Sequence, residues 1–430
     1  MNLVGKYKNI LHFISSMIEV IRNGYPARKL IVIGVTGTDG KTTVCHLIYE
    51  MLKKSGKKVA LVSSVAAYIG EKRIDTGFHV TTPDAKFLQP LIKKIKKSGI
   101  KFLVLETTSH GLDQHRVLGC NFWAGLLTNI THEHLDYHKI LENYKKAKGK
   151  LFKKVKIAVL NKDDESYSYF RSLPKSSAKI ITYSVNQRAS LWTKGIKLKN
   201  NKMQFSIMEG KRIYVIKTKL IGEYNVSNIL AATAVVRECK VNWDDILDVL
   251  VKFKGVSGRM ETIDMGQQFS VIVDFAHTPS ALEKVLTTLS KLKKGRLIVI
   301  FGCAGERDIL KRPMMGEIST RLADISVFTA EDPRHEDVDK IIDTMVEGVN
   351  HKFAIEVNVT DKLDFVEGKH IFIRIPDRSK AINFAIRKLA RKGDTVVICG
   401  KGHEKTMAFG DKEIPWSDHR TIKVALVGRF

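Results

Sequence analysis

The chain has 430 residues and a formal net charge of +27 at pH 7, and 44% of its residues are hydrophobic. This length exceeds what one hydrophobic core usually serves, so two or three domains are expected. No apolar run approaches the ~20 residues of a membrane span, and Glu19 and Arg22 interrupt the N-terminal segment where a signal peptide would be apolar. The sequence therefore predicts a cytoplasmic protein without a membrane span.

The excess of positive charge would suit a nucleic-acid partner, because Lys and Arg release counterions from phosphate backbones. The lysines are instead spread over helical patterns such as residues 91–101 and 143–156, on the polar side of an apolar stripe. No basic motif interleaved with aromatic residues is present. We therefore predict no nucleic-acid partner, and a solvated basic surface that attracts anionic small molecules.

The cysteines lie far apart in the sequence and form no CxxC pair. This spacing argues against a disulfide framework and against a structural zinc site. The five residues are Cys45, Cys120, Cys239, Cys303 and Cys399.

In chain order, residues 1–27 predict a single amphipathic helix, and a βαβ alternation follows. Apolar runs that read as buried strands alternate with helical patterns, which indicates a mostly parallel sheet. These runs are residues 29–35, 57–64, 101–109, 123–130 and 156–164.

Between residues 178 and 220 the pattern changes to alternating polar and apolar segments, which predicts an antiparallel flank. A helix is expected at 225–239, and the βαβ alternation restarts after residue 257. The predicted fold class is α/β. The predicted domains are an N-terminal helical segment (1–27) and two α/β units, residues 28–256 and 257–430.

The segment 34–43, GVTGTDGKTT, places a glycine-rich loop directly after the first buried run. Small residues let backbone N–H groups approach a phosphate, and the N-terminus of the following helix adds partial positive charge. The spacing departs from the common GxxxxGK[ST] loop, which points to a subclass. A glycine turn without a phosphate is the alternative. The predicted ATP-binding residues of the loop are Gly37, Thr38, Gly40, Lys41, Thr42 and Thr43.

Glu106 ends a predicted strand, where open α/β sheets place functional groups, and an acidic residue there commonly holds Mg²⁺. The nearby histidines His132, His134 and His138 approach the HxHxDH pattern of zinc hydrolases. Tyr137 spoils that spacing, and such hydrolases need no phosphate loop. Magnesium is therefore favoured over zinc.

Eight spaced strings together resemble the Mur ligase family and, within it, the UDP-N-acetylmuramoyl-tripeptide synthetases. The strings are TGTDGKTT, TTPD, ETTSHGLDQHRV, NITHEHLDYH, DFAHTPSALEKVL, GCAGERDILKRPMMGEIS, EDPRHED and CGKGHEK. The resemblance implies a central P-loop ATPase domain and a C-terminal Rossmann-like domain. It also implies an ATP- and Mg²⁺-dependent ligase that adds the third amino acid to UDP-N-acetylmuramoyl-L-Ala-D-Glu through an acyl phosphate, in peptidoglycan biosynthesis.

The resemblance also implies roles for individual residues. Lys41 would hold the ATP phosphates, while Thr42, Glu106 and His134 would serve Mg²⁺. Lys148 matches a lysine that the family carries as a carbamate; by its sequence alone it reads as one solvated lysine among many. Further ATP contacts are implied for Asn225, Asn228, Arg259 and Asp274. Contacts to the UDP-muramoyl dipeptide are implied for Thr81, Thr82, Thr108, Gln114 and Arg116.

The acceptor amino acid is implied to meet Arg307, Arg334, Gly400 and Glu404. Members that add diaminopimelate carry DNPR where this chain has EDPR at 331–334. Arginine suits a distal carboxylate because its fork binds carboxylate in bidentate fashion, so meso-diaminopimelate is the predicted acceptor. Asp332 stands where the family has Asn. An added anion there would favour an ammonium if it faces the pocket, whereas pairing with a basic side chain would leave the arginine site intact.

About 28 residues precede the first strand, whereas the family normally carries a whole N-terminal domain that grips the uridine nucleotide. The expectation is a looser grip, a partner chain that replaces this domain, or a different substrate. Two other functions remain open at this point. One is a folylpolyglutamate- or cyanophycin-type amide ligase, and the other is a P-loop nucleic-acid-dependent ATPase.

Overall fold

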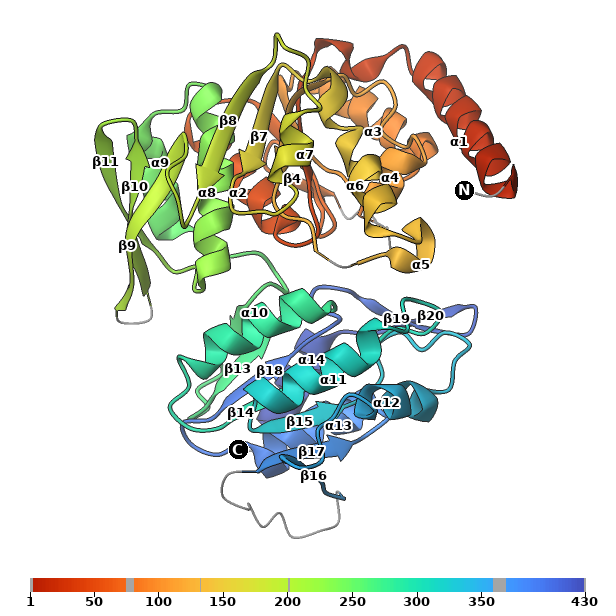
Figure 1. The fold of residues 1–430 in the computed structure, drawn as a ribbon, viewed down its shortest axis with the longest axis vertical. Helices are drawn as coiled ribbons and strands as arrows, with labels where there is room; N and C mark the ends of the chain where they lie inside the picture. Colours follow the sequence, from red (N-terminus) through yellow and green to blue (C-terminus); the bar gives the residue numbers. More distant parts are fainter. Residues whose placement is uncertain (1–2, 75–80, 132, 200–201, 359–368, 429–430) are drawn as a thin grey trace. The chain divides into compact units, whose positions relative to one another are not determined.

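The computed structural model describes residues 3–74, 81–131, 133–199, 202–358 and 369–428. The chain divides into two compact units, Met1–Lys254 and Gly255–Phe430. Each unit is built on its own sheet (Figure 1).

The first unit is built on a sheet of eleven strands in the order β11-β10-β9-β8-β7-β6-β1-β5-β2-β3-β4. Its centre, from β7 to β2, is parallel, and antiparallel pairs lie at both ends. The strands are β1 (Ile31–Thr36), β2 (Val59–Val62), β3 (Ala67–Ile69), β4 (Lys72–Ile74), β5 (Phe102–Glu106), β6 (Phe122–Leu127), β7 (Ile157–Asn161), β8 (Lys179–Ser184), β9 (Leu191–Lys199), β10 (Lys202–Glu209) and β11 (Arg212–Thr218).

The predicted antiparallel flank is confirmed for β9, β10 and β11 but is wrong for β8. That strand pairs parallel to β7 over its whole length, and β9 starts parallel to β8. The short helix α7 (Tyr167–Arg171) lies between β7 and β8, and such a crossover returns the chain in the same direction. The alternation of polar and apolar residues between 178 and 220 did not reveal this crossover.

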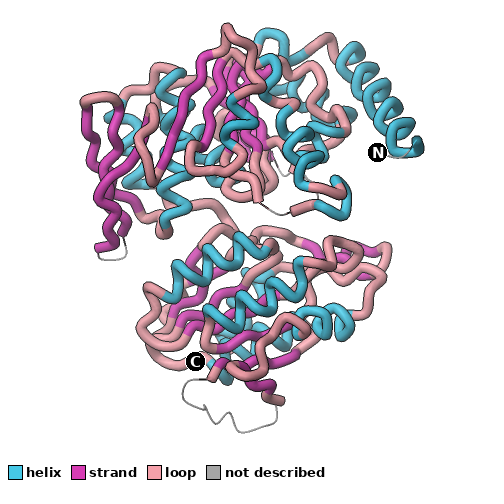
Figure 2. The backbone as a smooth tube through the Cα atoms, in the orientation of Figure 1, coloured by secondary structure: helices cyan, strands magenta, loops and turns pink. Residues whose placement is uncertain are grey.

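Helices cover both faces of the first sheet (Figures 1 and 2). Apolar side chains of α2, α8 and α9 form one buried cluster with the sheet, and side chains of α3, α4, α7 and the short 3-10 segments form the other. Strands buried on both faces read as continuous apolar runs, which is why the central strands were visible in the sequence. The helical elements are α1 (Leu3–Arg22), η1 (Pro26–Lys29), α2 (Lys41–Lys54), α3 (Ala85–Lys97), α4 (Ser109–Asp113), α5 (Leu135–His138), α6 (Leu141–Gly149), η2 (Phe152–Lys154), α7 (Tyr167–Arg171), α8 (Glu223–Glu238) and α9 (Trp243–Lys252).

The second unit is built on a sheet of seven strands in the order β12-β13-β18-β14-β15-β17-β16, with a separate hairpin formed by β19 and β20. Only β12 runs antiparallel to its neighbour. The strands are β12 (Glu261–Ile263), β13 (Ser270–Val273), β14 (Leu297–Phe301), β15 (Ile325–Phe328), β16 (Ala354–Glu356), β17 (His370–Arg374), β18 (Thr395–Ile398), β19 (Thr406–Phe409) and β20 (Lys412–Pro415).

Alternate residues of the second sheet face opposite layers of helices. In β14, Leu297 and Val299 pack with α10, α11 and α12, whereas Ile298 and Ile300 pack with α13 and α14. The helical elements are α10 (Pro279–Ser290), α11 (Lys311–Leu322), α12 (Val338–Val346), α13 (Arg378–Phe384), η3 (Ala385–Leu389) and α14 (Asp418–Val427). The parallel strands of this unit therefore end at one edge of a doubly covered sheet, where open α/β folds bind ligands.

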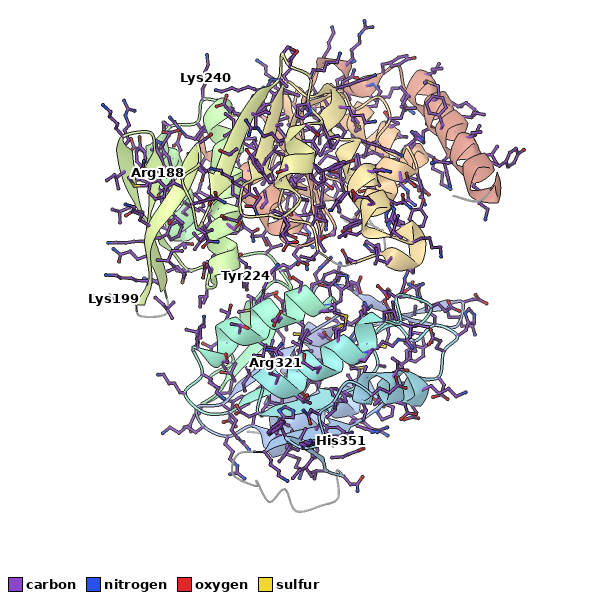
Figure 3. All side chains as sticks on the ribbon, in the orientation of Figure 1. Arg188, Lys199, Tyr224, Lys240, Arg321 and His351 are labelled. Atoms are coloured by element: carbon purple, nitrogen blue, oxygen red, sulfur yellow. The ribbon has the colours of Figure 1, made fainter. Side chains whose placement is uncertain are left out.

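Charged side chains project from many parts of both units (Figure 3). The labelled Arg188, Lys199 and Lys240 leave the first unit at separate places, and all three are exposed. No helix among the described residues is both long and apolar enough to span a bilayer. The surface thus carries dispersed charge, as the lysine-rich helical patterns predicted.

Candidate active site

The glycine-rich loop joins β1 to the N-terminus of α2. Gly37 and Gly40 adopt φ values of +146° and +83°. A Cβ atom at Gly37 would lie 1.8 Å from Thr128 Oγ1, and one at Gly40 would lie 2.3 Å from Asn228 Oδ1. Both glycines are therefore required by backbone conformation and by close packing.

The end of β6 braces this loop. Thr38 N–H donates to the Asn129 carbonyl oxygen (2.8 Å) and Asp39 N–H donates to Asn129 Oδ1 (2.9 Å). Thr128 Oγ1 donates to the Asp39 carbonyl oxygen (2.7 Å). Thr128 and Asn129 were not among the predicted residues, although Asn129 opens the quoted string NITHEHLDYH and Thr128 directly precedes it. They hold the loop in a fixed shape, which suits a binding site for a polyanion.

Two lysines meet at the loop. Lys41 Nζ donates to the carbonyl oxygens of Gly37 (3.0 Å) and Thr38 (2.7 Å), and Lys148 Nζ donates to the same Gly37 oxygen (2.7 Å). Lys148 is only 1% exposed. Burial lowers its pKa well below the usual range, and the charge of Lys41 lowers the pKa further. The solvated-lysine alternative is therefore wrong: Lys148 is a buried amine beside the phosphate loop.

An oxygen-rich cluster lies at the start of α2. Glu106 is 2% exposed; its Oε1 accepts from Thr42 Oγ1 (2.9 Å) and its Oε2 accepts from Ser64 N–H (2.9 Å). Thr42 Oγ1 also lies 3.1 Å from Ser64 Oγ. Hydroxyl and carboxylate oxygens are the donors that Mg²⁺ prefers, so this set fits magnesium. The hydrogen bonds bring Thr42 and Glu106 together with Ser64, which follows the carboxyl end of β2.

Tyr144 links the loop to the histidine segment. Its hydroxyl lies 3.0 Å from Thr38 Oγ1 and donates to Glu133 Oε2 (3.3 Å), and Lys148 Nζ lies 4.4 Å from the centre of its ring. His134 Nε2 lies 3.6 Å from Glu133 Oε1. His134 and Lys148 are therefore both grouped around Tyr144.

The same segment provides no support for zinc. His132 lies outside the described residues, and within the described ones no group of three or more His, Cys, Asp or Glu side chains could hold a metal. His138 is buried, and this burial lowers its pKa to about 4, so its ring is neutral near pH 7. It packs among aromatic rings, 5.4 Å from Tyr144 and 5.5 Å from His110.

The two predicted asparagines lie in the first turns of α8. Asn225 Nδ2 donates to the Ile221 carbonyl oxygen (2.8 Å), and Asn228 Nδ2 donates to Asn225 Oδ1 (3.1 Å). The N-cap of the helix is Gly222, so Asn225 does not cap it. The close approach of Asn228 to Gly40 places this pair at the phosphate loop.

Most of the residues predicted to hold the UDP-muramoyl dipeptide form one connected group. Thr82 Oγ1 donates to the Glu106 carbonyl oxygen (3.1 Å) and accepts from Thr108 N–H (2.9 Å). Arg116 Nη1 donates to the Thr82 carbonyl oxygen (2.9 Å), and its Nη2 donates to Gln114 Oε1 (2.7 Å). Thr108 caps α4 through Gly111 N–H (3.0 Å), so one of its roles is structural. Thr81 is partly exposed beside Thr82.

In the second unit, Arg259 lies shortly before β12, and Asp274 follows the carboxyl end of β13. The Arg259 guanidinium lies 4.2 Å from the centre of the Phe275 ring. Asp274 accepts from the backbone N–H groups of Met260 (2.7 Å) and Ala276 (2.8 Å). Asp274 thus fixes two backbone segments.

Three charged side chains of the second unit form a chain of ion pairs around a buried lysine. Lys401, which is 2% exposed, places Nζ 2.7 Å from Asp332 Oδ1 and 2.6 Å from Glu404 Oε2. Ala408 N–H also donates to Asp332 Oδ1 (3.0 Å). Of the two orientations considered for Asp332, the structure has the one paired with a basic side chain. Lys401 was not among the predicted residues, although it lies in the quoted CGKGHEK string.

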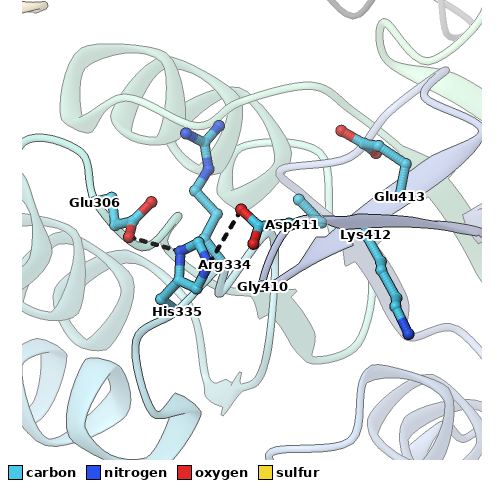
Figure 4. A pocket seen from close by; sticks show the side chains of 8 residues that line it. Glu306, Arg334, His335, Gly410, Asp411, Lys412 and Glu413 are labelled. Atoms are coloured by element: carbon cyan, nitrogen blue, oxygen red, sulfur yellow. Dashed lines mark hydrogen bonds and ion pairs between the residues drawn. The ribbon is translucent and has the colours of Figure 1, made fainter.

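A pocket of about 290 Å³ lies beside the β19–β20 hairpin, and Arg334 lines it (Figure 4). Arg334 has a φ of +54°, which its backbone hydrogen bonds to Ala408 (3.0 Å) and Gly410 (2.7 Å) hold in place. Its guanidinium forms no hydrogen bond or ion pair with any residue that the structure describes. Arg307 is exposed and does not line this pocket. The lining residues are Glu306, Arg334, His335, Ala408, Gly410, Asp411, Lys412 and Glu413.

Two family models match the chain. One, described as the Mur ligase middle domain, matches residues 35–236, and one described as the Mur ligase, glutamate ligase domain, matches residues 258–402. The UDP-N-acetylmuramoyl-L-alanyl-D-glutamate--2,6-diaminopimelate ligase of Geobacillus thermodenitrificans is 38% identical over 94% of this chain and 81% of its own length. The UDP-N-acetylmuramyl-tripeptide synthetase of Borrelia garinii subsp. bavariensis is 38% identical over 97% of this chain and 80% of its own length.

Solved structures show the same fold. A UDP-N-acetylmuramoyl-L-alanyl-D-glutamate--2,6-diaminopimelate ligase aligns with a TM-score of 0.63 at 31% identity, covering 94% of this chain and 79% of that one. A folylpolyglutamate synthase of Mycobacterium tuberculosis aligns with a TM-score of 0.72 over 90% of this chain and 91% of that one, but at 16% identity it shows the fold alone. The chain therefore belongs to the Mur ligase family of ATP-dependent amide ligases, which confirms the predicted family, fold class and enzyme class.

Proposed function

We propose that this chain joins an amino acid, meso-diaminopimelate, to the D-glutamate of UDP-N-acetylmuramoyl-L-Ala-D-Glu in peptidoglycan synthesis. The observation that carries the proposal is the 38% identity, over 94% of this chain, to a relative named for this reaction with 2,6-diaminopimelate. A carboxylate is a poor electrophile, so ATP first converts it to an acyl phosphate, and the amine of the acceptor then displaces phosphate. Such reactions are accelerated mainly by positioning and charge neutralisation.

The first unit would bind ATP through the loop amides and Lys41, with Asn225 and Asn228 beside the loop at Gly40. Thr42 and Glu106, with Ser64, would hold Mg²⁺, which when bound neutralises charge on the phosphates. Lys41 would keep its ammonium on the terminal phosphates as the acyl phosphate forms. Its present hydrogen bonds to two loop carbonyls place that ammonium at the centre of the loop.

Lys148 would act as a carbamate. Only a neutral amine attacks CO₂, and burial together with Lys41 lowers the pKa of Lys148, which favours the neutral form. The new bond joins Nζ to the CO₂ carbon, one proton leaves the nitrogen, and a carboxylate replaces a cation. That anion, with His134, would face the second Mg²⁺ that the resemblance implies.

The dipeptide end of the substrate would meet the group that connects Thr82, Thr108, Gln114 and Arg116, with Thr81 beside it. Arg116 is the cation of this group, and it shares its donors between Thr82, Gln114 and Asp84. In the second unit, Arg259 and Asp274 would supply further ATP contacts. The partner chain suggested by the short N-terminal segment stays a prediction.

The acceptor would lie against the Arg334 pocket, with its distal carboxylate on Arg334 and Arg307. Gly400 and Glu404, from the loop after β18, would meet the distal amine. Asp332 would act through Lys401, because that ammonium is shared between Asp332 and Glu404. The resulting site offers a carboxylate-binding arginine and an ammonium-binding glutamate, which suits an acceptor with both groups at its far end.

Product analysis tests the proposal. Purified protein is mixed with UDP-muramoyl dipeptide, ATP, Mg²⁺ and a panel of amino acids. The products are identified by their masses in a mass spectrometer. We expect ADP, phosphate and a tripeptide adduct, formed fastest with meso-diaminopimelate. Ligation of glutamate to a folate, or ATP hydrolysis stimulated by nucleic acid, would replace this function with one of the two alternatives.

A further inference from the structure

Helix α1 exposes an apolar face to solvent. The side chains of this face recur every three or four residues along the helix, so they form one stripe, called the α1 stripe below. They are Tyr7, Ile10, Leu11, Ile14, Ile18 and Ile21, and each is 48–65% exposed. A helix on the surface of a globular protein normally turns such a stripe toward the core. The α1 stripe therefore indicates a surface that binds something outside this chain.

The opposite face of α1 is the one that packs against the first unit. Ser16 and Val20 are buried, and the Phe13 ring lies 5.3 Å from the His115 ring. A Cβ atom added to Gly119 would lie 2.9 Å from Val20 Cγ1, so the helix lies close against the loop before β6. Helix α1 also packs against α3 at the edge of the unit (Figure 1). The α1 stripe thus points away from the unit and does not hold the helix in place.

Basic side chains border the α1 stripe. Lys8 and Arg22 each follow directly after a residue of the stripe, and both are exposed. Glu19 is the one acidic residue in the sequence of the helix, and its carboxylate lies 3.8 Å from Arg22 of the same helix. Arg28 and Lys29 in η1 are exposed and add two cations shortly after α1 ends. The surroundings of the stripe are therefore positively charged, in a chain whose formal net charge is +27.

We propose that α1 binds the surface of an anionic lipid bilayer, lying in the plane of the membrane. The α1 stripe enters the boundary between headgroups and acyl chains, and the bordering cations meet the lipid phosphates. Helices that bind membranes in this way combine an apolar face with basic side chains, and each such charge adds to the attraction. A second copy of this chain fits the stripe less well, because two paired α1 helices would bring their cations together. The binding does not depend on the proposed reaction, and it would hold the enzyme at a membrane surface.

Sedimentation with lipid vesicles tests the proposal. The full chain is mixed with vesicles of phosphatidylglycerol and phosphatidylcholine, or of phosphatidylcholine alone. The fraction of protein bound is measured after centrifugation at several salt concentrations. We expect binding to the vesicles that contain phosphatidylglycerol, and binding at least ~10-fold weaker to phosphatidylcholine alone, because several cations contribute to the attraction. Added salt should weaken the binding, since it screens these charges.

Three variants make the test specific to α1. Ile14→Ser combined with Ile18→Ser should lower the partition coefficient ~10-fold or more, because two apolar side chains no longer leave water. Lys8→Gln combined with Arg22→Gln should lower it roughly 5-fold for each charge removed. Ile213→Ser is the matched control and should leave binding unchanged, because Ile213 is 61% exposed on β11, at one end of the first sheet. All these side chains are exposed, so each variant should keep its fold, which circular dichroism checks.

The same measurements can contradict the proposal. Absence of binding to the anionic vesicles, or equal binding to both kinds of vesicle, would overturn it. Unchanged binding of a folded Ile14→Ser, Ile18→Ser variant would also overturn it, because the α1 stripe would then not be the contact. Light scattering covers the other occupant of the stripe. A dimer in solution that the two serine substitutions dissociate, without binding to vesicles, would assign the stripe to a second copy of this chain instead.

Discussion

The phosphate-loop region of the first unit and the Glu331–Arg334 region of the second unit differ in how far their charged side chains are paired with other groups. In the first, Glu106 accepts two hydrogen bonds, and Lys41 and Lys148 both donate to the loop. In the second, Arg334 and Glu331 form no ion pair with the residues that the structure describes. In this region Lys401 is paired with Asp332 and Glu404, and His335 lies at ion-pair distance from Glu306 and Asp411.

This difference matches the two functions expected of the regions, which are stabilisation of developing charge in the first and selection of the amino acid in the second. A site that stabilises developing charge benefits from groups already held in place, because reorientation during the reaction costs energy. A site that selects one amino acid benefits from charged groups that the correct ligand satisfies and an incorrect ligand leaves buried and unpaired. Variants in the first region should therefore act on rate, and variants in the second on acceptor selectivity.

The largest effect is expected for Lys41→Ala and Glu106→Ala. One removes a phosphate counter-charge and the other removes a metal ligand, and losing one such preorganised group typically costs ~100-fold or more in rate. Turnover is measured as ADP release that depends on UDP-muramoyl dipeptide. Lys53→Ala is the matched control, because Lys53 lies at the far end of the same helix. Near-normal turnover of either variant with an intact fold would contradict the ATPase role of the loop.

Lys148→Ala tests whether the buried amine of the first region acts as a carbamate. The variant should be inactive, because it loses the proposed carbamate, and an added short-chain carboxylate should restore part of the turnover by replacing that anion. Lys146→Ala is a control from the same helix. Mass spectrometry of the intact protein under CO₂ should show the carbamate mass on the unmodified chain and not on Lys148→Ala. Full activity of the variant would show that the buried amine is structural.

The sequence predicted the first region better than the second, for a physical reason. The phosphate loop is contiguous, so spacing alone brings Gly37, Lys41 and Thr42 together. Ser64 and Glu331 depend on which strand ends meet at the edge of a sheet, and sequence spacing does not record this. Lys148 was identified only through the family resemblance, because a buried lysine in a lysine-rich helix looks like a solvated one.

The prediction of the fold was limited in the same way, because local sequence patterns do not record which elements meet in space. Long apolar runs such as residues 29–35 and 101–109 predicted central strands that the structure confirms. The parallel direction of β8 depends on the α7 crossover and was not predicted. The short hairpin β19–β20 was also missed, because strands of four residues carry little periodic signal. That hairpin nevertheless carries backbone contacts to Arg334 and Asp332.

Arg334→Ala should break the selectivity of the second region. We expect the KM for diaminopimelate to rise ~10- to 100-fold, because a charge-assisted pair contributes roughly 1.5–3 kcal/mol, while the KM for ATP should change little. Arg334→Lys should restore only part of the loss, since lysine offers no bidentate fork. Steady-state kinetics with each substrate varied in turn provides the measurement. An equal rise in both constants would indicate a general disturbance of the hairpin rather than loss of a carboxylate contact.

Asp332→Asn is expected to have the smallest effect. It tests whether the negative charge of Asp332 is neutralised by Lys401. Asparagine keeps the Oδ1 acceptor for Lys401 and for Ala408 N–H, so the fold should be retained. Removing one negative charge leaves Lys401 paired with Glu404 alone, and the region then repels a carboxylate less. The preference for diaminopimelate over lysine, measured as a ratio of kcat/KM values, should therefore stay the same or increase by a few-fold. A clear shift of that ratio toward lysine would show that Asp332 does not act through Lys401.

Faster ligation of lysine than of diaminopimelate by the unmodified protein would overturn the acceptor assignment and leave the ligase function in place.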